Sequence, residues 1–311
     1  MPRPRLAVTM GDPAGIGPEL CLRLFTEDAP DFEADLTIFG SDQVLNDVSL
    51  ATGLPLGGDL IDFGPVEGLI PAEISKHTGQ AAHSYLIDAI DATLAGHFDG
   101  IVTCPLSKEA LALAGISHPG HTEILVERTG AKRHAMMLTS AELSCSLVTT
   151  HCPLAQVAGL LTTERILEVI ELTAETMTRL HGRPAKLAVL GLNPHAGENG
   201  LFGSEEQTII QPAIDAARAK GIDLTDPLPP DTAFLPSIRQ SIDAHICMYH
   251  DQGLIPLKTL SFDTGVNVTL GLPIVRTSVD HGTAFDIAWD AIASPTSLYN
   301  AIHLAAKLCS P

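Results

Sequence analysis

The sequence predicts an α/β protein with two domains. Short apolar runs of strand length alternate with longer segments in which apolar residues recur at helical spacing, and this alternation favours a sheet with much parallel pairing. The length of 311 residues exceeds that of one typical domain. A hydrophobic content of 45%, with 26 glycines and 22 prolines, indicates a folded chain with many tight connections rather than a disordered one.

Seven apolar runs are expected to form strands, and they span residues 6–10, 36–39, 101–104, 135–139, 144–150, 186–192 and 245–249. The segment 164–180 carries its apolar residues on one helical face and is expected to be a single amphipathic helix. Pro18 stands where proline is favoured, just inside the first turn of a helix.

The net charge of -19 argues against nucleic acids and anionic lipids as partners, because both would be repelled. No apolar run reaches the roughly 18 residues of a membrane span. The first residues are not followed by the apolar core of a signal peptide, so the cytoplasm is the expected compartment. The six cysteines include no CxxC pair and are expected to be reduced and mainly buried.

Three histidines share one position relative to the expected strands. His151, His195 and His250 each come just after an apolar run. Ligands of open α/β sheets bind beyond the carboxyl ends of strands, so three imidazoles presented there can converge on one site. Zn²⁺ accepts imidazole nitrogen at ~2.0–2.1 Å, and three such ligands leave positions open for a substrate. The alternative is that these are unrelated surface histidines among the 13 of the chain.

The first strand ends in a glycine-containing turn that begins with Gly11 and Asp12 and leads into a helix. Such a turn suits the close approach of a ligand to the backbone, although it can also serve only to shape the connection. Its pattern is neither GxGxxG nor the Walker spacing, which disfavours a standard dinucleotide fold and a P-loop NTPase.

Candidate groups for binding an anion are few because the chain is poor in Lys and Arg. Arg276 interrupts an apolar stretch, where an unpaired guanidinium would be costly and a phosphate or carboxylate would compensate it. Lys258 and Asn267 precede it. His121 and Thr122 open a helical stretch with Thr122 as the expected N-cap, and helix starts favour anions. The ordinary alternatives are surface ion pairs and simple capping.

Eight motifs follow one another along the chain, and together they are highly specific. They are MGDPAGIGPE (residues 10–19), GHTE (120–123), TH (150–151), NPHAGE (193–198), MYHDQG (248–253), VNVTLGLP (266–273), RTS (276–278) and DHGTAFD (280–286). On these motifs the chain resembles, from end to end, the 4-hydroxythreonine-4-phosphate dehydrogenase family of pyridoxal phosphate biosynthesis.

The resemblance implies an α/β, two-domain fold like that of isocitrate and isopropylmalate dehydrogenases, not a Rossmann fold. Residues 1–130 and 265–311 would form the domain on the nucleotide-binding side. Residues 131–264 would form the domain that binds metal and substrate and makes the dimer. The resemblance also implies a homodimer whose active sites draw metal ligands from both subunits.

Carried over residue by residue, the resemblance assigns the three strand-end histidines to the metal and further positions to substrate and cofactor. Substrate binding is expected at His121, Thr122, Lys258, Asn267 and Arg276. Cofactor binding is expected at Gly11, Asp12, Asp280, His281, Gly282, Thr283 and Asp286.

The implied reaction is oxidation of 4-phosphooxy-L-threonine with NAD or NADP to a 3-oxo acid that then loses CO₂. One divalent metal per site (Zn, Mg or Co) would lower the pKa of the reacting hydroxyl. The base that takes the hydroxyl proton is expected to be Asp231, with Lys108 as the alternative. Trp289, Asp290 and Ala291 replace a glycine-containing turn found in many relatives, which leaves the choice between NAD and NADP open.

Three other functions compete with this reading. Relatives of the same family oxidise 4-phospho-D-threonate or erythronate and share most of these residues. A metal-dependent hydrolase would need only the three histidines and a bound water. A binding protein that has lost catalysis would bind the ligand without turnover.

Overall fold

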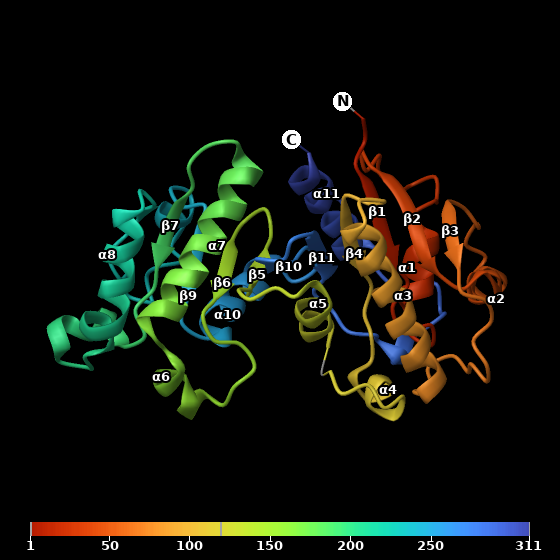
Figure 1. Cartoon of the computed structure of the whole chain (residues 1–311), viewed down its shortest axis with the longest axis horizontal. Helices are drawn as coiled ribbons and strands as arrows, with labels where there is room; N and C mark the ends of the chain where they lie inside the picture. Colours follow the sequence, from red (N-terminus) through yellow and green to blue (C-terminus); the bar gives the residue numbers. More distant parts are fainter. Residues whose placement is uncertain (1, 119, 311) are drawn as a thin grey trace. The chain divides into compact units, whose positions relative to one another are not determined.

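The computed structural model describes residues 2–118 and 120–310, and these residues form two compact units. Unit 1 contains the residues up to Lys132 together with those from Leu272 onwards, and unit 2 is Arg133–Gly271. The sequence analysis predicted one domain of residues 1–130 together with 265–311, and a second domain of residues 131–264. The two units are described separately below (Figure 1).

Unit 1 is built on a parallel sheet whose strands are β1 Arg5–Thr9, β2 Asp35–Gly40, β3 Asp59–Asp62, β4 Gly100–Thr103 and β11 Val275–Val279. Their order is β3-β2-β1-β4-β11, and each neighbouring pair is parallel. The chain moves outward from β1 to β3 and then returns to the other side of β1 as β4. The carboxyl ends of β1 and β4 therefore flank a point where the strand order reverses, which is where open α/β sheets bind ligands.

The helices of unit 1 are α1 Gly17–Arg23, α2 Asp42–Thr52, α3 Lys76–Leu94, α4 Lys108–Leu113, α5 His121–Thr129, the short 3-10 helix η4 Phe285–Ile287 and α11 Thr296–Cys309. Helix α11 packs on one face of the sheet, where the Thr277 hydroxyl donates to the carbonyl of Ala301 at 2.8 Å. Because neighbouring side chains of a strand point to opposite faces, Arg276 projects to the other face. Pro18 lies in the first turn of α1, as predicted.

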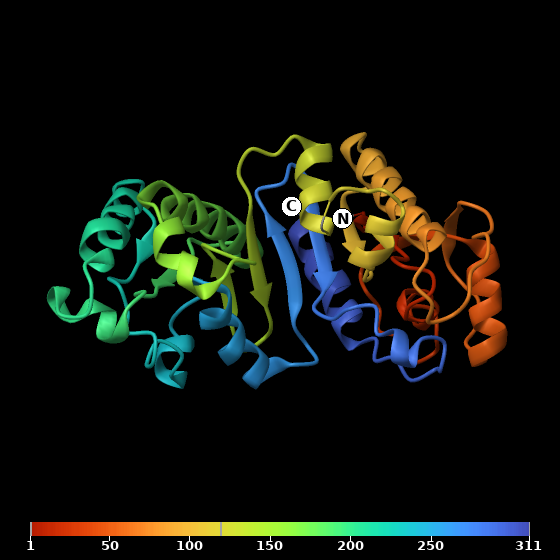
Figure 2. The same ribbon diagram turned by 90° about the horizontal axis from the view of Figure 1, so that it is seen from below.

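Unit 2 has a mixed sheet whose strands are β5 Ala135–Thr139, β6 Ser144–Leu147, β7 Lys186–Val189, β8 Asp223–Leu224, β9 Ala244–Cys247 and β10 Val266–Leu270. Their order is β10-β5-β6-β9-β7-β8. Strand β5 is antiparallel to both of its neighbours, and Figure 2 shows it in yellow-green beside β10 in blue. The pairs β6·β9, β9·β7 and β7·β8 are parallel.

The helices of unit 2 are η1 Leu154–Gln156, α6 Val157–Leu160, α7 Thr163–His181, η2 Pro194–Gly200, the π-helix η3 Glu206–Ile210, α8 Gln211–Ala219, α9 Pro236–Arg239 and α10 His250–Ser261. Helices α7 and α10 cover opposite faces of the sheet. Thr173 of α7 donates to the hydroxyl of Ser146 at 2.8 Å, whereas Gly253 of α10 packs against the adjacent Cys145 and against Cys247. The central strands are therefore buried on both sides.

The predicted α/β class is confirmed, and each of the seven predicted strand segments overlaps an observed strand. The helix predicted over 164–180 is observed as α7. Strands β3, β8, β10 and β11 were missed. Strand β3 is short, polar and largely exposed, and the apolar stretch that contains β10 and β11 is interrupted at Gly271, whose φ is +82°.

Four of the six cysteines are buried, as predicted, and the described residues contain no disulfide. Within the described ranges, none of the helices combines the length and the apolar character that a membrane crossing requires.

Helix α2 provides a matched test of core packing in unit 1. Leu45 is 4% exposed and Leu50 is 86% exposed on the same helix. Leu45→Ala should lower the free energy of unfolding by about 2–5 kcal/mol, because it removes buried methyl groups and leaves a cavity. Leu50→Ala should change it by less than about 0.5 kcal/mol. Equal effects of the two substitutions in urea unfolding would contradict the packing described for α2.

Candidate functional site

The three candidate metal-binding histidines follow three adjacent parallel strands of unit 2. His151 follows β6, His195 follows β7, and His250 follows β9. Strand β9 lies between β6 and β7 and is parallel to both. The carboxyl ends of all three strands therefore lie along one edge of the sheet. The sequence argument from strand ends agrees with this topology.

His151 and His250 lie close together at this edge. Their ring centroids are 5.6 Å apart and the rings are tilted by 46°. His250 is the first residue of α10, and its Nδ1 lies 2.7 Å from Oδ1 of Asp251. A carboxylate on one ring nitrogen orients the imidazole and leaves Nε2 as the nitrogen for a metal. This arrangement is common for histidines that bind metals.

His195 lies on η2, and its Nδ1 is 3.0 Å from Oε2 of Glu198. Its ring also packs edge-on against Phe202, with centroids 5.9 Å apart. The carboxylate therefore orients this imidazole in the same way as Asp251 orients His250. Both acidic residues were missed in the sequence analysis, although each stands within three positions of its histidine.

In the part of a single chain that the structure describes, no three His, Cys, Asp or Glu side chains gather closely enough to hold a metal ion. The structure brings His151 and His250 together, and it places His195 at the end of the neighbouring strand β7. The donors offered at this edge are imidazole nitrogens, which suit zinc and cobalt better than they suit magnesium.

Arg276 is the central cation of the candidate substrate residues in unit 1. It lies on β11, is 3% exposed, and its guanidinium donates to the hydroxyl of Thr103 at 2.8 Å. Burial lowers the pKa of Arg276 to about 9. The pKa of His121 lies well below the ordinary value, first because its ring is desolvated and second because of the charge of Arg276. His121 is therefore neutral near neutral pH.

The start of helix α5 carries His121 and lies near Arg276. Its N-cap is Gly120, and its first residues are His121 and Thr122, so the prediction that Thr122 is the N-cap is wrong. A side chain added at Gly120 would meet Cε of Lys108 at 3.6 Å, so Lys108 lies over the start of α5. The structure thus gathers Lys108, His121, Thr122 and Arg276 in unit 1.

The other predicted substrate residues belong to unit 2. Asn267 lies on β10 and pairs with Leu138 of β5. Lys258 lies on α10, with its Nζ 5.7 Å from the ring centroid of Phe262. The predicted substrate residues are therefore divided between the two units.

The turn after β1 is shaped by close backbone contacts. Gly11 has a φ of +73°, and a side chain there would lie 2.1 Å from the carbonyl oxygen of Pro105, which follows β4. Asp12 is buried, and its carboxylate accepts from the N–H of Ala14 at 3.0 Å and from the hydroxyl of Thr78 at 3.5 Å. Burial raises the pKa of Asp12 to about 6.

The two predicted nucleotide-binding segments lie against each other in unit 1. The N–H of Ile16 donates to the carbonyl of Thr283 at 3.0 Å, and a side chain at Gly15 would lie 2.8 Å from the same oxygen. The N–H of Asp280 donates to the hydroxyl of Ser297 at 3.2 Å. His281, Gly282 and Asp286 are exposed on this loop.

Asp231 is exposed in the turn that follows Leu228. Leu228 pairs in parallel with Leu190 just beyond β7, so Asp231 lies at the same edge of the unit 2 sheet as the three histidines. In this turn the carbonyl of Pro229 accepts from the N–H of Thr232 at 3.2 Å and from the N–H of Ala233 at 3.0 Å.

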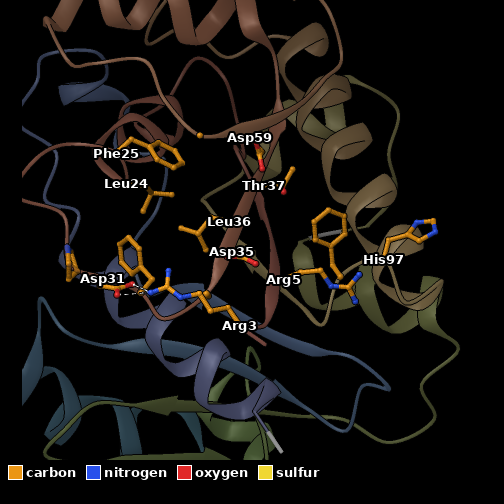
Figure 3. A pocket seen from close by; sticks show the side chains of 15 residues that line it. Arg3, Arg5, Leu24, Phe25, Asp31, Asp35, Leu36, Thr37, Asp59 and His97 are labelled. Carbon is orange, nitrogen blue, oxygen red and sulfur yellow. Dashed lines mark hydrogen bonds and ion pairs between the residues drawn. The ribbon is translucent and has the colours of Figure 1, made fainter. Parts of the chain in front are cut away.

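A cavity of about 670 Å³ lies at the opposite end of the unit 1 strands. Figure 3 shows Arg3, Arg5, Asp35 and Thr37 around it, at the beginnings of β1 and β2. None of the predicted site residues lines it. This cavity is therefore separate from the candidate site.

Comparisons with known proteins support the motifs read from the sequence. Residues 33–305 match the family model described as pyridoxal phosphate biosynthetic protein PdxA. The 4-hydroxythreonine-4-phosphate dehydrogenase of Desulforapulum autotrophicum is 44% identical, over 98% of this chain and 95% of that protein. The D-threonate 4-phosphate dehydrogenase of Pectobacterium atrosepticum is 40% identical, over 97% and 98%.

The crystal structure of 4-hydroxythreonine-4-phosphate dehydrogenase from Klebsiella pneumoniae superposes on this chain with a TM-score of 0.90 and 41% identity, covering 99% of this chain and 100% of that one. The names of these relatives are those of oxidoreductases. The resemblance stated from the eight motifs is thereby confirmed, and the chain belongs to the pyridoxal phosphate biosynthetic protein PdxA family.

Proposed function

We propose that the chain is a divalent-metal-dependent dehydrogenase of 4-phosphooxy-L-threonine that uses NAD or NADP. The product is 2-amino-3-oxo-4-phosphooxybutanoate, which decarboxylates to 3-amino-2-oxopropyl phosphate. The observation that carries the proposal is the set of histidines at the ends of β6, β9 and β7, two of them oriented by carboxylates. The names of the relatives support the substrate.

The metal ligands in this proposal are His151, His195 and His250. Orientation of His195 and His250 through Nδ1 supports binding through Nε2. A bound divalent ion (Zn, Co or Mg) supplies a Lewis acid that lowers the pKa of the substrate hydroxyl and stabilises negative charge on its oxygen. The choice of imidazole donors favours zinc or cobalt.

The proposed enzyme is a cytoplasmic homodimer with active sites that draw residues from both subunits. Exposed apolar side chains on η1, on α6, on α10 and at the C-cap of α10 support such an interface, and they are Leu154, Leu160, Ile255 and Phe262. Exposed apolar patches commonly mark surfaces where protein chains associate.

Arg276, His121 and Thr122 of unit 1, with Lys258 and Asn267 of unit 2, bind the anionic groups of the substrate in this proposal. Arg276 remains charged near neutral pH because its pKa of about 9 lies above that range. A phosphate or carboxylate beside it would offset the cost of its burial. Neutral His121 donates a hydrogen bond without adding a second charge beside the guanidinium.

Asp231 is the favoured general base for the C3 hydroxyl. It lies at the same edge of the unit 2 sheet as the histidines, and an exposed carboxylate there is available to accept a proton. Lys108 lies over the start of α5, near His121. This position suits contact with an anion better than removal of the hydroxyl proton.

The nicotinamide cofactor is proposed to bind at Gly11 and Asp12 and on the loop of Asp280, His281, Gly282, Thr283 and Asp286. Contact between Ile16 and Thr283 supports one site formed by both segments. The reversal of strand order beside β1 supports the same position. A nicotinamide bound there would accept the hydride from C3 of the substrate, and the resulting β-keto acid would lose CO₂.

A second substrate, 4-phospho-D-threonate or the corresponding erythronate, is favoured by one observation. The relative from Pectobacterium atrosepticum, 40% identical, is named D-threonate 4-phosphate dehydrogenase. Both substrates carry a phosphate and a hydroxyl. The preferred substrate is therefore identified by comparing their kcat/KM values, each measured with NAD and with NADP.

The purified chain should reduce NAD⁺ or NADP⁺ when 4-phosphooxy-L-threonine and a divalent metal are added, as followed by the absorbance of the reduced cofactor. Chelation should abolish the activity, and His195→Ala should lower kcat/KM by at least ~100-fold, because a metal ligand is lost. His97→Ala, which alters the separate cavity of Figure 3, is the control. Phosphate release without cofactor reduction would instead indicate a hydrolase.

The two candidate bases can be separated kinetically. Asp231→Asn should lower kcat by ~10²–10⁴-fold with little change in KM, since it removes the proton acceptor. Lys108→Met should mainly raise KM, because it removes a positive charge near the start of α5. The reverse pattern, with kcat lost only in Lys108→Met, would assign the base to Lys108.

Asp12 should make the stability depend on pH. Its pKa is about 6 in the folded chain against 3.8 for the ordinary value, so the folded state binds the proton more tightly. Between those values the contribution of Asp12 to stability falls as the pH rises. Asp12→Asn should therefore be more stable than the wild type above pH 6, by up to ~3 kcal/mol, and similar to it below pH 4. Parallel curves of unfolding free energy against pH would contradict this account.

A further inference from the structure

The loop that carries His195 has an unusual backbone. Consecutive residues have positive φ, with values of 53° at His195, 53° at Ala196, 78° at Gly197, 43° at Glu198 and 57° at Asn199. Residues other than glycine and asparagine rarely adopt this left-handed conformation, and a run of them needs support from surrounding structure. The direction of the His195 imidazole therefore depends on what holds this backbone.

The buried carboxylate of Glu206 holds the beginning of the loop. Glu206 is 5% exposed and is the first residue of η3. Its Oε1 accepts from the backbone N–H groups of Leu192 at 2.8 Å and Asn193 at 2.7 Å, and its Oε2 accepts from Nδ2 of Asn193 at 3.0 Å. These contacts fix the two residues that precede Pro194 and His195.

The loop also closes around Glu206 from the other side. A side chain at Gly197 would lie 2.5 Å from Oε2 of Glu206. A side chain at Gly191 would lie 2.8 Å from Cα of Ala196 and 3.1 Å from Oε1 of Glu206. The backbone before and after His195 is thus packed against one carboxylate, with no room for further atoms.

We propose that Glu206 is a positioning residue for His195, which sets the direction of its imidazole for the metal although it lies 11 positions away in the sequence. The proposal rests on the proposed metal-binding function of His195. Glu206 acts through the backbone of residues 192–197, and it is not a metal ligand itself. A carboxylate is required because all three atoms that contact it are N–H donors.

Glu205 offers a matched control. Its Oε2 also accepts from Nδ2 of Asn193, at 2.8 Å, but it receives neither of the two backbone N–H groups. It is more exposed than Glu206. Glu205→Gln therefore removes a neighbouring negative charge and leaves the backbone contacts of Glu206 in place.

The test compares wild type, Glu206→Gln and Glu205→Gln as full-length protein. In the metal-free state, ¹⁵N-histidine NMR reports the imidazole of His195, whose signals are assigned by their loss in His195→Asn. In the second measurement, Co²⁺ alone is titrated and its visible absorption gives the Kd. Thermal unfolding is recorded for each variant, so that loss of fold is recognised.

Glu206→Gln should shift the His195 imidazole signals and raise the Kd for Co²⁺ by about tenfold or more, since changes behind a ligand typically cost 10–100-fold in affinity. The signals of His151 and His250 and the Kd of Glu205→Gln should stay near those of the wild type. A lower unfolding midpoint with unchanged His195 signals and unchanged Kd would overturn the proposal.

Two further outcomes are also decisive. If Glu206→Gln does not fold, Glu206→Asp replaces it, because it keeps the charge on a shorter side chain. Glu206→Asp should also shift the His195 signals relative to the wild type. No shift would overturn the proposal. If wild type binds no Co²⁺, the proposed metal site fails. The metal-free NMR comparison then still decides whether Glu206 sets the direction of the His195 imidazole.

Discussion

Parallel pairing of β9 with both β6 and β7 is the constraint on which the candidate site depends. Because the three strands run in the same direction side by side, whatever follows each of them is delivered to one edge of the sheet. Helices α7 and α10 bury the two faces of these strands and so keep their order. The histidines then stand at the ends of rigid elements, which is the placement that a metal site needs in order to keep its ligands in a fixed geometry.

The electrostatics of the two units differ in a way that suits an anionic substrate. The chain carries a net charge of -19, yet unit 1 buries the guanidinium of Arg276 beside a neutral His121 and near the start of α5. Burial of a cation is costly, and an incoming phosphate or carboxylate would offset that cost. Unit 2 presents imidazoles oriented by Glu198 and Asp251. In the proposed enzyme all three metal ligands come from unit 2, whereas the groups that bind the anion come from both units.

Each unit contains candidate site residues whose backbone conformation or buried carboxylate is unfavourable. The left-handed run that begins at His195 is supported by Glu206, and the turn at Gly11 is packed against Pro105 so closely that only glycine fits. Asp12, in the same turn, is buried with a raised pKa. Such features lower stability unless surrounding contacts offset them, and they tend to be kept where geometry matters for function.

The sequence by itself determined the α/β class, the helix α7, the position of each histidine after an apolar run and, through eight motifs, the family. These follow from local patterns, because burial on one face imposes a period along the chain. Tertiary structure alone decided that β9 lies between β6 and β7, that Asp251 and Glu198 orient two imidazoles, and that Glu206 holds the loop of His195. It also decided that Gly120 rather than Thr122 caps α5, and that β3 and β11 are strands. The physical reason is that strand partners and side-chain contacts join residues far apart in the chain, and no local period encodes which of them meet.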